Sequence, residues 1–142
     1  MKAVNPYLNF NGQAEEAFKF YQSVFGGELE IIRYNEMEDT MGATDEDLKL
    51  VANAALSLTG DIKLFGSDIL DSFEQDHKRG NDFYINLETE SEEETERLFK
   101  KLSDGGEVEM PLENTGSAEK FGEVKDQFGI RWMVYYQGTA AI

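Results

Sequence analysis

The side chains in this sequence that could do chemistry are amides, phenols and carboxylates, because it has no cysteine and a single histidine. Without cysteine there is no thiolate nucleophile, no disulfide and no zinc–thiolate site. His77 stands among charged residues in QDHKRG with no second histidine at ligand spacing, so we interpret it as a solvated linker residue. No serine lies in a GxSxG pattern, and no catalytic residue is therefore assigned.

Two carboxylates, Asp82 and Glu123, are the candidates for acid–base work. A partly apolar cleft raises the pKa of a carboxyl group toward the range that a general base needs. The same pair could instead hold a hard cation such as Mg²⁺ together with water. The sequence leaves both readings open.

Amide and tyrosine side chains recur with period two in the stretches NPYLNF (5–10) and NDFYINL (81–87). In a strand, alternate side chains share a face. The opposite face of each stretch is apolar and is expected to pack under a helix: Leu8 and Phe10, then Phe83, Ile85 and Leu87. Asparagine is depleted in strands, so its repetition favours the lining of a ligand cavity, with an ordinary solvated sheet face as the alternative.

Carried into the later strands, the alternation places further residues on the same side, and Trp132, Val134 and Tyr136 on the core side. The predicted ligand-binding cleft is lined by Asn5, Tyr7, Asn9, Asn53, Asp82, Tyr84, Asn86, Glu123, Arg131, Met133 and Tyr135.

The elements that must position these residues occur twice. GGELE (26–30) and GGEVE (105–109) each follow a segment with an apolar helical stripe, which predicts helices near 12–25 and 91–103. Segments 50–68 and 119–136 each predict a pair of strands, with turns at 59–61 and 126–129. Each half therefore reads as a strand, a helix and three strands.

The predicted fold is α+β, with two βαβββ modules that form an eight-stranded sheet containing a cleft between the modules. We expect one domain over 1–142, with module 1 at about 4–68, a polar linker at 69–80 and module 2 at about 81–137. The helices are expected on one face of the sheet, and no strands are expected to be parallel.

The net charge is −16, from 29 acidic and 13 basic side chains. This charge repels phosphate backbones and anionic lipids, so neither nucleic acid nor a membrane is an expected partner. The acidic runs at 36–47 and 88–96 are interpreted as solvated segments. The N-terminal stretch lacks the apolar run of a signal peptide, and the absence of cysteine suits a cytoplasmic location.

Several stretches together resemble one known family. They are PYLNFNGQAEEAFKFYQSVFGGELE, VANAALSLTGDIKLFGSD, MPLENT and FGEVKDQFGIRWMV, within about residues 5–137. This combination resembles the PhnB-like branch of the vicinal oxygen chelate superfamily, which includes glyoxalase, bleomycin-resistance and extradiol dioxygenase proteins. The resemblance implies paired βαβββ modules and a homodimer.

The metal-binding members of that superfamily carry His or Glu ligands on the first and last strands of each module. By resemblance these positions fall on Asn5, Asp82 and Met133, with the fourth near Leu64, and a histidine frequent in PhnB-like proteins is replaced by Asn53. Neutral amides and a thioether are poor ligands for Zn, Ni or Fe, so we expect no metal and no cofactor. No glycine-rich strand-to-helix loop is present to hold an adenosyl cofactor.

The leading functional hypothesis is a metal-independent protein that binds a small, planar or cationic organic molecule between Tyr7, Tyr84, Tyr135 and the amide side chains. One alternative is a metal-dependent glyoxalase-type lyase, isomerase or dioxygenase. Another is an interaction protein without enzymatic activity, whose cleft is vestigial. The sequence does not name the ligand.

Overall fold

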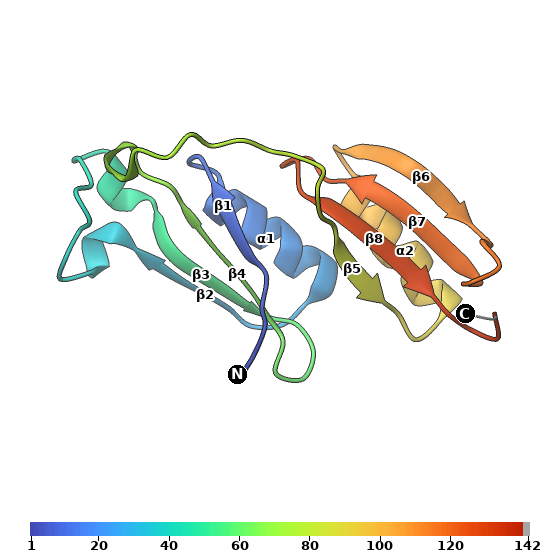
Figure 1. The fold of residues 1–142 in the computed structure, drawn as a ribbon. Coiled ribbons are helices and arrows are strands. Elements are labelled where there is room, and N and C mark those ends of the chain that lie inside the picture. The colour runs from blue at the N-terminus through green and yellow to red at the C-terminus, as the bar shows by residue number, and fades with distance from the viewer. Residues whose placement is uncertain (141–142) are drawn as a thin grey trace. The chain divides into compact units, whose positions relative to one another are not determined.

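The computed structural model describes residues 1–140 of the chain, and the chain divides into two compact units. The N-terminal unit is Met1–Lys78 and the C-terminal unit is Arg79–Ile142. Each unit contains one predicted module (Figure 1). That the two form a single domain stays a prediction.

The N-terminal unit follows the predicted order of one strand, one helix and three strands. Its elements are β1 (Tyr7–Phe10), α1 (Ala14–Phe25), β2 (Leu29–Arg33), β3 (Val51–Ser57) and β4 (Lys63–Asp68), with short 3-10 helices η1 (Tyr34–Glu36), η2 (Asp47–Lys49) and η3 (Asp71–Phe73). The strands form one sheet in the order β1-β4-β3-β2.

The C-terminal unit repeats this order. Its elements are β5 (Ile85–Glu88), α2 (Glu92–Ser103), β6 (Glu107–Glu113), β7 (Lys120–Lys125) and β8 (Arg131–Tyr136). The strands form a second sheet in the order β5-β8-β7-β6. The prediction of an α+β fold with two βαβββ modules and eight strands is confirmed. The strands form two four-stranded sheets, where a single eight-stranded sheet was expected.

The expectation that no strands are parallel was wrong. β1 is parallel to β4, and β5 is parallel to β8. The helix after the first strand returns the chain to the end where that strand began, so the first and second strands run the same way. Two antiparallel hairpins then bring the fourth strand back in that same direction, beside the first.

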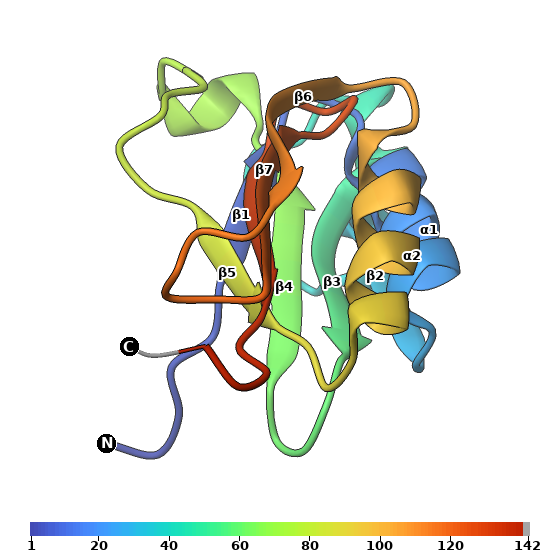
Figure 2. The same cartoon turned by 90° about the vertical axis from the view of Figure 1, so that its right-hand side faces the viewer.

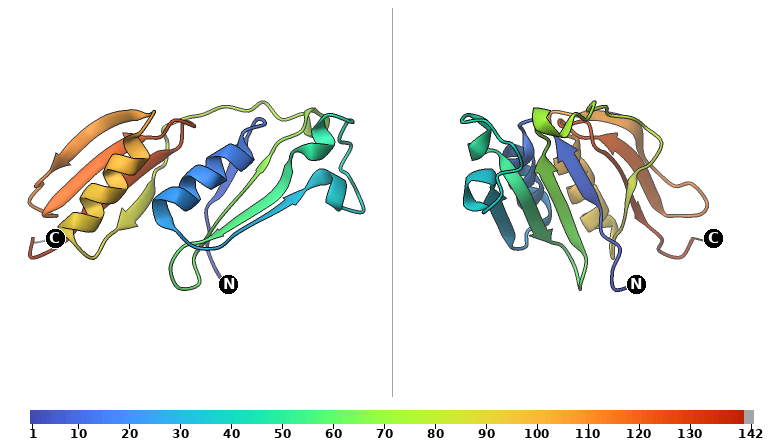
Figure 3. Two further views of the ribbon diagram at one scale, coloured as in Figure 1. Left: turned by 180° about the vertical axis from the view of Figure 1, so that it is seen from behind. Right: turned by 60° about the vertical axis from the view of Figure 1, so that its left-hand side comes forward.

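Each helix packs on one face of its own sheet (Figures 2 and 3). The buried face of α1 consists of Ala14, Ala17, Phe18, Tyr21 and Val24, and that of α2 of Thr95, Leu98, Phe99 and Leu102. These positions recur three or four residues apart, which gives a single apolar stripe along each helix. Opposite α2, the core side of β8 carries the fully buried Trp132 and Val134.

A glycine lets an aromatic ring of the helix approach the sheet in each unit. A Cβ on Gly66 of β4 would lie 2.6 Å from a ring carbon of Phe18, and one on Gly122 of β7 would lie 2.7 Å from a ring carbon of Phe99. Such distances are far shorter than any real contact, so a side chain at either position would push the helix away from the sheet.

The helix ends use different devices at their N-termini. The Ser91 hydroxyl accepts a hydrogen bond from the Glu94 N–H at 3.1 Å and so caps α2. At α1 the Ala14 N–H instead donates to the carboxylate of Asp68 at the end of β4, at 2.9 Å. Asp68 is buried and also accepts the Val51 N–H, so one carboxylate ties α1, β3 and β4 together.

The two predicted hairpin turns are present. In the turn between β7 and β8, the buried carboxylate of Asp126 accepts the N–H groups of Phe128 and Ile130 at 2.8 and 3.0 Å. Its second oxygen accepts the indole N–H of Trp132 at 2.9 Å. Gly129 takes a positive φ of 85°, a conformation that glycine adopts without strain.

One core assignment was wrong. Phe83 was expected under the helix, but 68% of its surface is exposed. β5 begins only at Ile85, so Phe83 precedes the strand and the alternation of faces does not apply to it.

Among residues 1–140, no helix combines the length and the apolar character that crossing a membrane requires.

Candidate functional site

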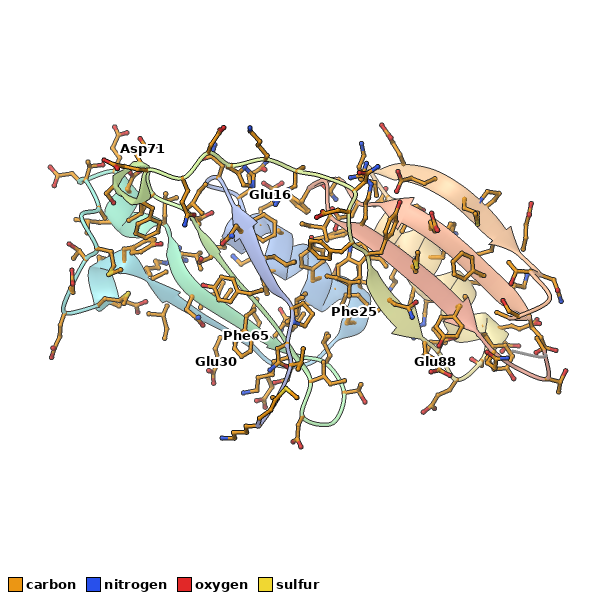
Figure 4. The ribbon with its side chains drawn as sticks, in the orientation of Figure 1. Glu16, Phe25, Glu30, Phe65, Asp71 and Glu88 are labelled. Atoms are coloured by element: carbon orange, nitrogen blue, oxygen red, sulfur yellow. The ribbon has the colours of Figure 1, made fainter. Side chains whose placement is uncertain are left out.

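Each sheet has one face without a helix, which we call its open face. In the N-terminal sheet, Tyr7 and Asn9 of β1 lie on this face beside Phe65 and Ser67 of β4. The Tyr7 hydroxyl donates a hydrogen bond to the Ser67 hydroxyl at 2.9 Å, and the rings of Tyr7 and Phe65 stack with centroids 6.5 Å apart. Phe65 is labelled in Figure 4. Tyr7 is still 51% exposed, so this ring offers a face for contact.

The predicted amide residues of the N-terminal unit have separate positions. Asn53 lies in the centre of the sheet on β3, opposite Ile32 of β2, and is partly buried. Asn5 lies before β1, where its side-chain oxygen accepts the Lys63 N–H at 2.9 Å. That bond gives Asn5 a structural contact at the start of β4.

Three side chains form a hydrogen-bonded cluster on the open face of the C-terminal sheet. The Arg131 Nε–H donates to both carboxylate oxygens of Glu109, at 3.2 and 3.3 Å, and the Tyr84 hydroxyl donates to the same carboxylate at 3.1 Å. Arg131 also donates from Nη1 to the Gly80 carbonyl at 2.6 Å. The side chains of Arg131 and Glu109 are only 16% and 26% exposed, so the pair is held in place more firmly than a surface ion pair.

Burial is the main cause that raises the pKa of the Tyr84 phenol above its ordinary value. The hydrogen bond to Glu109 adds to the rise, as do the negative charges of Glu109 and Glu123, and the positive charge of Arg131 opposes it. Tyr84 is therefore a hydrogen-bond donor at neutral pH.

The next row across the same face contains three predicted residues. Asn86 of β5, Met133 of β8 and Glu123 of β7 are cross-strand neighbours. The row ends at Met110 of β6. A thioether thus lies on each side of the Glu123 carboxylate.

Tyr135 lies one row further along β8, opposite Glu88 of β5 and Phe121 of β7. The pKa of its phenol is raised, first by burial and then by a hydrogen bond to the Glu88 carboxylate, while the Asn86 amide acts in the opposite direction. Tyr84 and Tyr135 therefore share a pattern, in which a phenol on the open face is fixed by a neighbouring glutamate.

Asp82 and His77 also lie outside the strands. Asp82 is exposed and precedes β5. His77 belongs to the N-terminal unit and follows η3. The His77 Nε2 atom is buried without a hydrogen-bond partner, which differs from the solvated residue that we expected.

Sequence reasoning missed Glu109, although this residue ends the repeated phrase GGEVE. The strand register shifts between Val108 and Met110, so Glu109 is an extra residue in β6 relative to β7. Simple alternation cannot place a residue in a bulge. A chemical argument could have predicted it, because an arginine that is largely buried, such as Arg131, requires a carboxylate partner.

Across residues 1–140, no three His, Cys, Asp or Glu side chains gather closely enough to hold a metal ion. At the positions that the resemblance assigns to metal ligands, Asn5 and Met133 offer an amide and a thioether, and Asp82 offers a carboxylate. The fourth position, near Leu64, is a core position, because Leu64 is fully buried.

Comparison with known proteins gives consistent matches along the chain. A family model described as 3-demethylubiquinone-9 3-methyltransferase matches residues 2–135. Protein YjdN of Escherichia coli is 30% identical over 138 residues, which cover 92% of each chain.

Solved structures show the same fold. Protein PA1353 of Pseudomonas aeruginosa is 33% identical with a TM-score of 0.87, covering 96% of this chain and 98% of that one. A putative 3-demethylubiquinone-9 3-methyltransferase, PhnB protein, of Bacillus cereus is 28% identical with a TM-score of 0.74, covering 95% and 99%. A glyoxalase/bleomycin resistance protein of Albidiferax ferrireducens, at 13% identity and a TM-score of 0.64 over 96% and 98% of the chains, shares the fold alone.

Proposed function

The chain belongs to the 3-demethylubiquinone-9 3-methyltransferase family, the PhnB-like branch of the vicinal oxygen chelate superfamily, and on that premise we propose that it binds a small organic molecule on an open sheet face. The observation that carries this proposal is the pair of phenols on the C-terminal open face, Tyr84 and Tyr135, each fixed by a glutamate. Rings held in one orientation contact a ligand at little entropic cost.

The site is proposed without a transition metal. Of the positions that the superfamily uses for ligands, only Asp82 carries a carboxylate, and the Asn5 oxygen already accepts the Lys63 N–H. This donor set does not fit Zn, Ni or Fe, which require several imidazole or carboxylate ligands.

The name of the family implies an adenosyl cofactor, which the residues at the helix starts do not fit. An anionic or dinucleotide-like cofactor typically uses free N–H groups at a helix N-terminus that follows a glycine-rich loop. Here the first turn of α1 donates to Asp68 and the first turn of α2 is capped by Ser91. We therefore derive no methyl-transfer step for this chain.

Ligand binding is tested by screening fragments against the intact protein. Thermal shift selects the hits, and amide chemical shifts in ¹H–¹⁵N spectra locate them. We expect hits to perturb amides of β5, β7 and β8, and Tyr84→Ala to abolish the perturbation because the ring is lost. Phe83→Ala is the matched control, since Phe83 is an adjacent exposed aromatic residue. Hits that never reach these strands, or that survive Tyr84→Ala, would contradict the proposal.

Metal analysis separates this function from a metal-dependent glyoxalase-type enzyme. Protein purified without chelator is expected to contain well under about one equivalent of Zn, Ni or Fe, because neutral side chains replace the usual ligands. Stoichiometric metal that is lost in Asp82→Ala would instead support the enzyme. An interaction protein with a vestigial cleft would show neither metal nor fragment hits on the open faces.

A further inference from the structure

Glu123 is a carboxylate without a partner in the middle of a sheet. It lies on β7, an inner strand between β8 and β6, and faces the open side. Its side chain is partly buried, and no described residue forms a hydrogen bond or an ion pair with it. Partial burial of a carboxylate without an opposite charge costs free energy, and a bound cation would reduce that cost.

The basic side chains of the same face are committed elsewhere. Arg131 is bound through Nε to Glu109 and through Nη1 to the Gly80 carbonyl. Lys125 pairs with Glu107 at 3.4 Å. The bulge in β6 makes Glu109 the extra residue there, and Glu109 is the carboxylate that takes Arg131. The geometry thus leaves Glu123 without a cation of the protein's own.

The surroundings of Glu123 suit an organic cation. Its cross-strand neighbours are the thioethers of Met133 and Met110, and the ring of Tyr84 is close enough for the Glu123 charge to act on its phenol. Phe121 is two residues away on the same strand and the same face. Polarizable sulfur and aromatic rings are favourable neighbours for an ammonium group, and the net charge of −16 attracts cations to the whole molecule.

A metal ion fits this position poorly. Hard cations such as Mg²⁺ and Ca²⁺ require several oxygen ligands, and the two nearest cross-strand neighbours of Glu123 offer sulfur. Among the described residues, Glu123 is not part of any group of three His, Cys, Asp or Glu side chains that could hold a metal ion.

We propose that Glu123 receives the cationic nitrogen of the ligand, so that the molecule bound on this face is a small organic amine or quaternary ammonium compound with a flat apolar part. The inference rests on the proposed ligand-binding function and specifies its ligand class. It predicts that the protein prefers cationic to neutral or anionic ligands, and that this preference depends on the carboxylate of Glu123.

Three probes of matched size test the inference on the intact protein: phenethylamine as the cation, 2-phenylethanol as the neutral analogue and phenylacetate as the anion. Each is titrated into ¹⁵N-labelled protein while the amide shifts of β7 and β8 are followed. We expect phenethylamine to bind roughly fivefold or more tightly than 2-phenylethanol, and phenylacetate to bind most weakly. Added salt should reduce the advantage of the cation.

Glu123→Gln is the decisive variant, because it keeps the shape of the side chain and removes its charge. The preference for phenethylamine should fall to a ratio of about one, with the melting temperature unchanged. Glu113→Gln is the matched control, since it removes the same charge from the neighbouring edge strand β6 at an exposed position. The control should keep the full preference.

The outcomes separate the two proposals. If all three probes perturb the open face equally, and Glu123→Gln changes nothing, the ligand class is wrong while the binding function stands. If no probe perturbs the open face, both proposals fail. If MgCl₂ moves the same amides and Glu123→Gln abolishes that response while phenethylamine has no effect, Glu123 is an inorganic cation ligand and the inference is overturned.

Discussion

Tyr84 and Ile85 are adjacent in sequence and serve opposite sides of the C-terminal sheet. Tyr84 donates to Glu109 on the open face, while Ile85 pairs with the buried Trp132. Tyr84→Ala should remove fragment binding with little loss of stability. Ile85 is partly buried, so Ile85→Ala should cost near the lower end of about 2–5 kcal/mol in the free energy of unfolding. Urea unfolding measures both. A larger loss for Tyr84→Ala would mean that the two faces are reversed.

Asp126 is the residue on which the turn between β7 and β8 depends. Its carboxylate accepts three N–H donors and is almost fully buried. Asp126→Asn places an amide N–H₂ against at least one of these donors, so we expect a loss of about 2–4 kcal/mol in the free energy of unfolding. Indole fluorescence during urea unfolding reports it through Trp132.

Asp61→Asn serves as the control for that change, because Asp61 is exposed in the other hairpin turn. It should leave stability within about 0.5 kcal/mol of the starting protein. Equal effects in the two turns would show that the hydrogen bonds to Asp126 contribute nothing particular.

Among the secondary-structure elements, α1 is joined to the end of β2 by an ion pair. Glu15 accepts a hydrogen bond from Arg33 at 2.8 Å and lies 3.1 Å from Lys19. The hydrogen bond from Arg33 has the largest effect, followed by that from Lys19, and these interactions lower the pKa of Glu15 from 4.5 to about 2. Because the folded pKa lies below the unfolded one, the stabilisation is complete above pH 4.5 and is lost as the pH falls toward about 2.

The carboxylate of Glu15 is 36% exposed, so solvent screens the pair and its contribution should stay below about 1 kcal/mol. Glu15→Gln should reduce the free energy of unfolding above pH 4.5 and have only a small effect near pH 2, as measured by urea titrations across that range. Glu16→Gln on the same turn is the control (Figure 4). A difference that persists unchanged to the acid limit would exclude the ion pair as its cause.

Local sequence patterns predicted most of the elements and showed which strand residues of the candidate site share a face. The helices end where glycine pairs stop them, at Phe25 and close to Ser103, because the glycine effect is local. The direction of β1 relative to β4 depends on the path of the chain through α1. The alternation of apolar and polar side chains along a strand contains no information about that path. Phe83 was placed on the wrong side because it lies before β5 begins. Glu109 was missed because it lies in a bulge of β6. The composition of the ligand site itself is still a prediction.

For the molecule as a whole, we predict a homodimer. Each sheet leaves two edge strands, and the edges carry exposed apolar side chains such as Ile32 on β2 and Val108 on β6. Exposed edges with apolar residues favour association, and two-fold dimers are the commonest assemblies. Sedimentation velocity at tens of micromolar should give twice the chain mass of 16.1 kDa.

Lysine substitutions test whether those edges form the dimer contact. Val108→Lys or Ile32→Lys should shift the sedimentation profile toward the monomer if its strand forms the contact, because a charge is costly to bury there. A monomer for the unsubstituted protein at the same concentration would contradict the prediction.

The parallel pairing of β1 with β4 bears on how the chain is made in the cell. β1 leaves the ribosome well before β4, yet β4 is its only strand partner in the N-terminal sheet and is completed at Asp68. Until β4 is available, the backbone hydrogen-bonding groups of β1 are unpaired, which favours binding of chaperones to the nascent chain. Once Lys78 has emerged, every strand of that sheet is available, while residues 79–136, which hold the strands of the C-terminal unit, take on the order of ten seconds to synthesise. Synonymous codons that slow translation after residue 78 should therefore help the first half to fold before the second half appears.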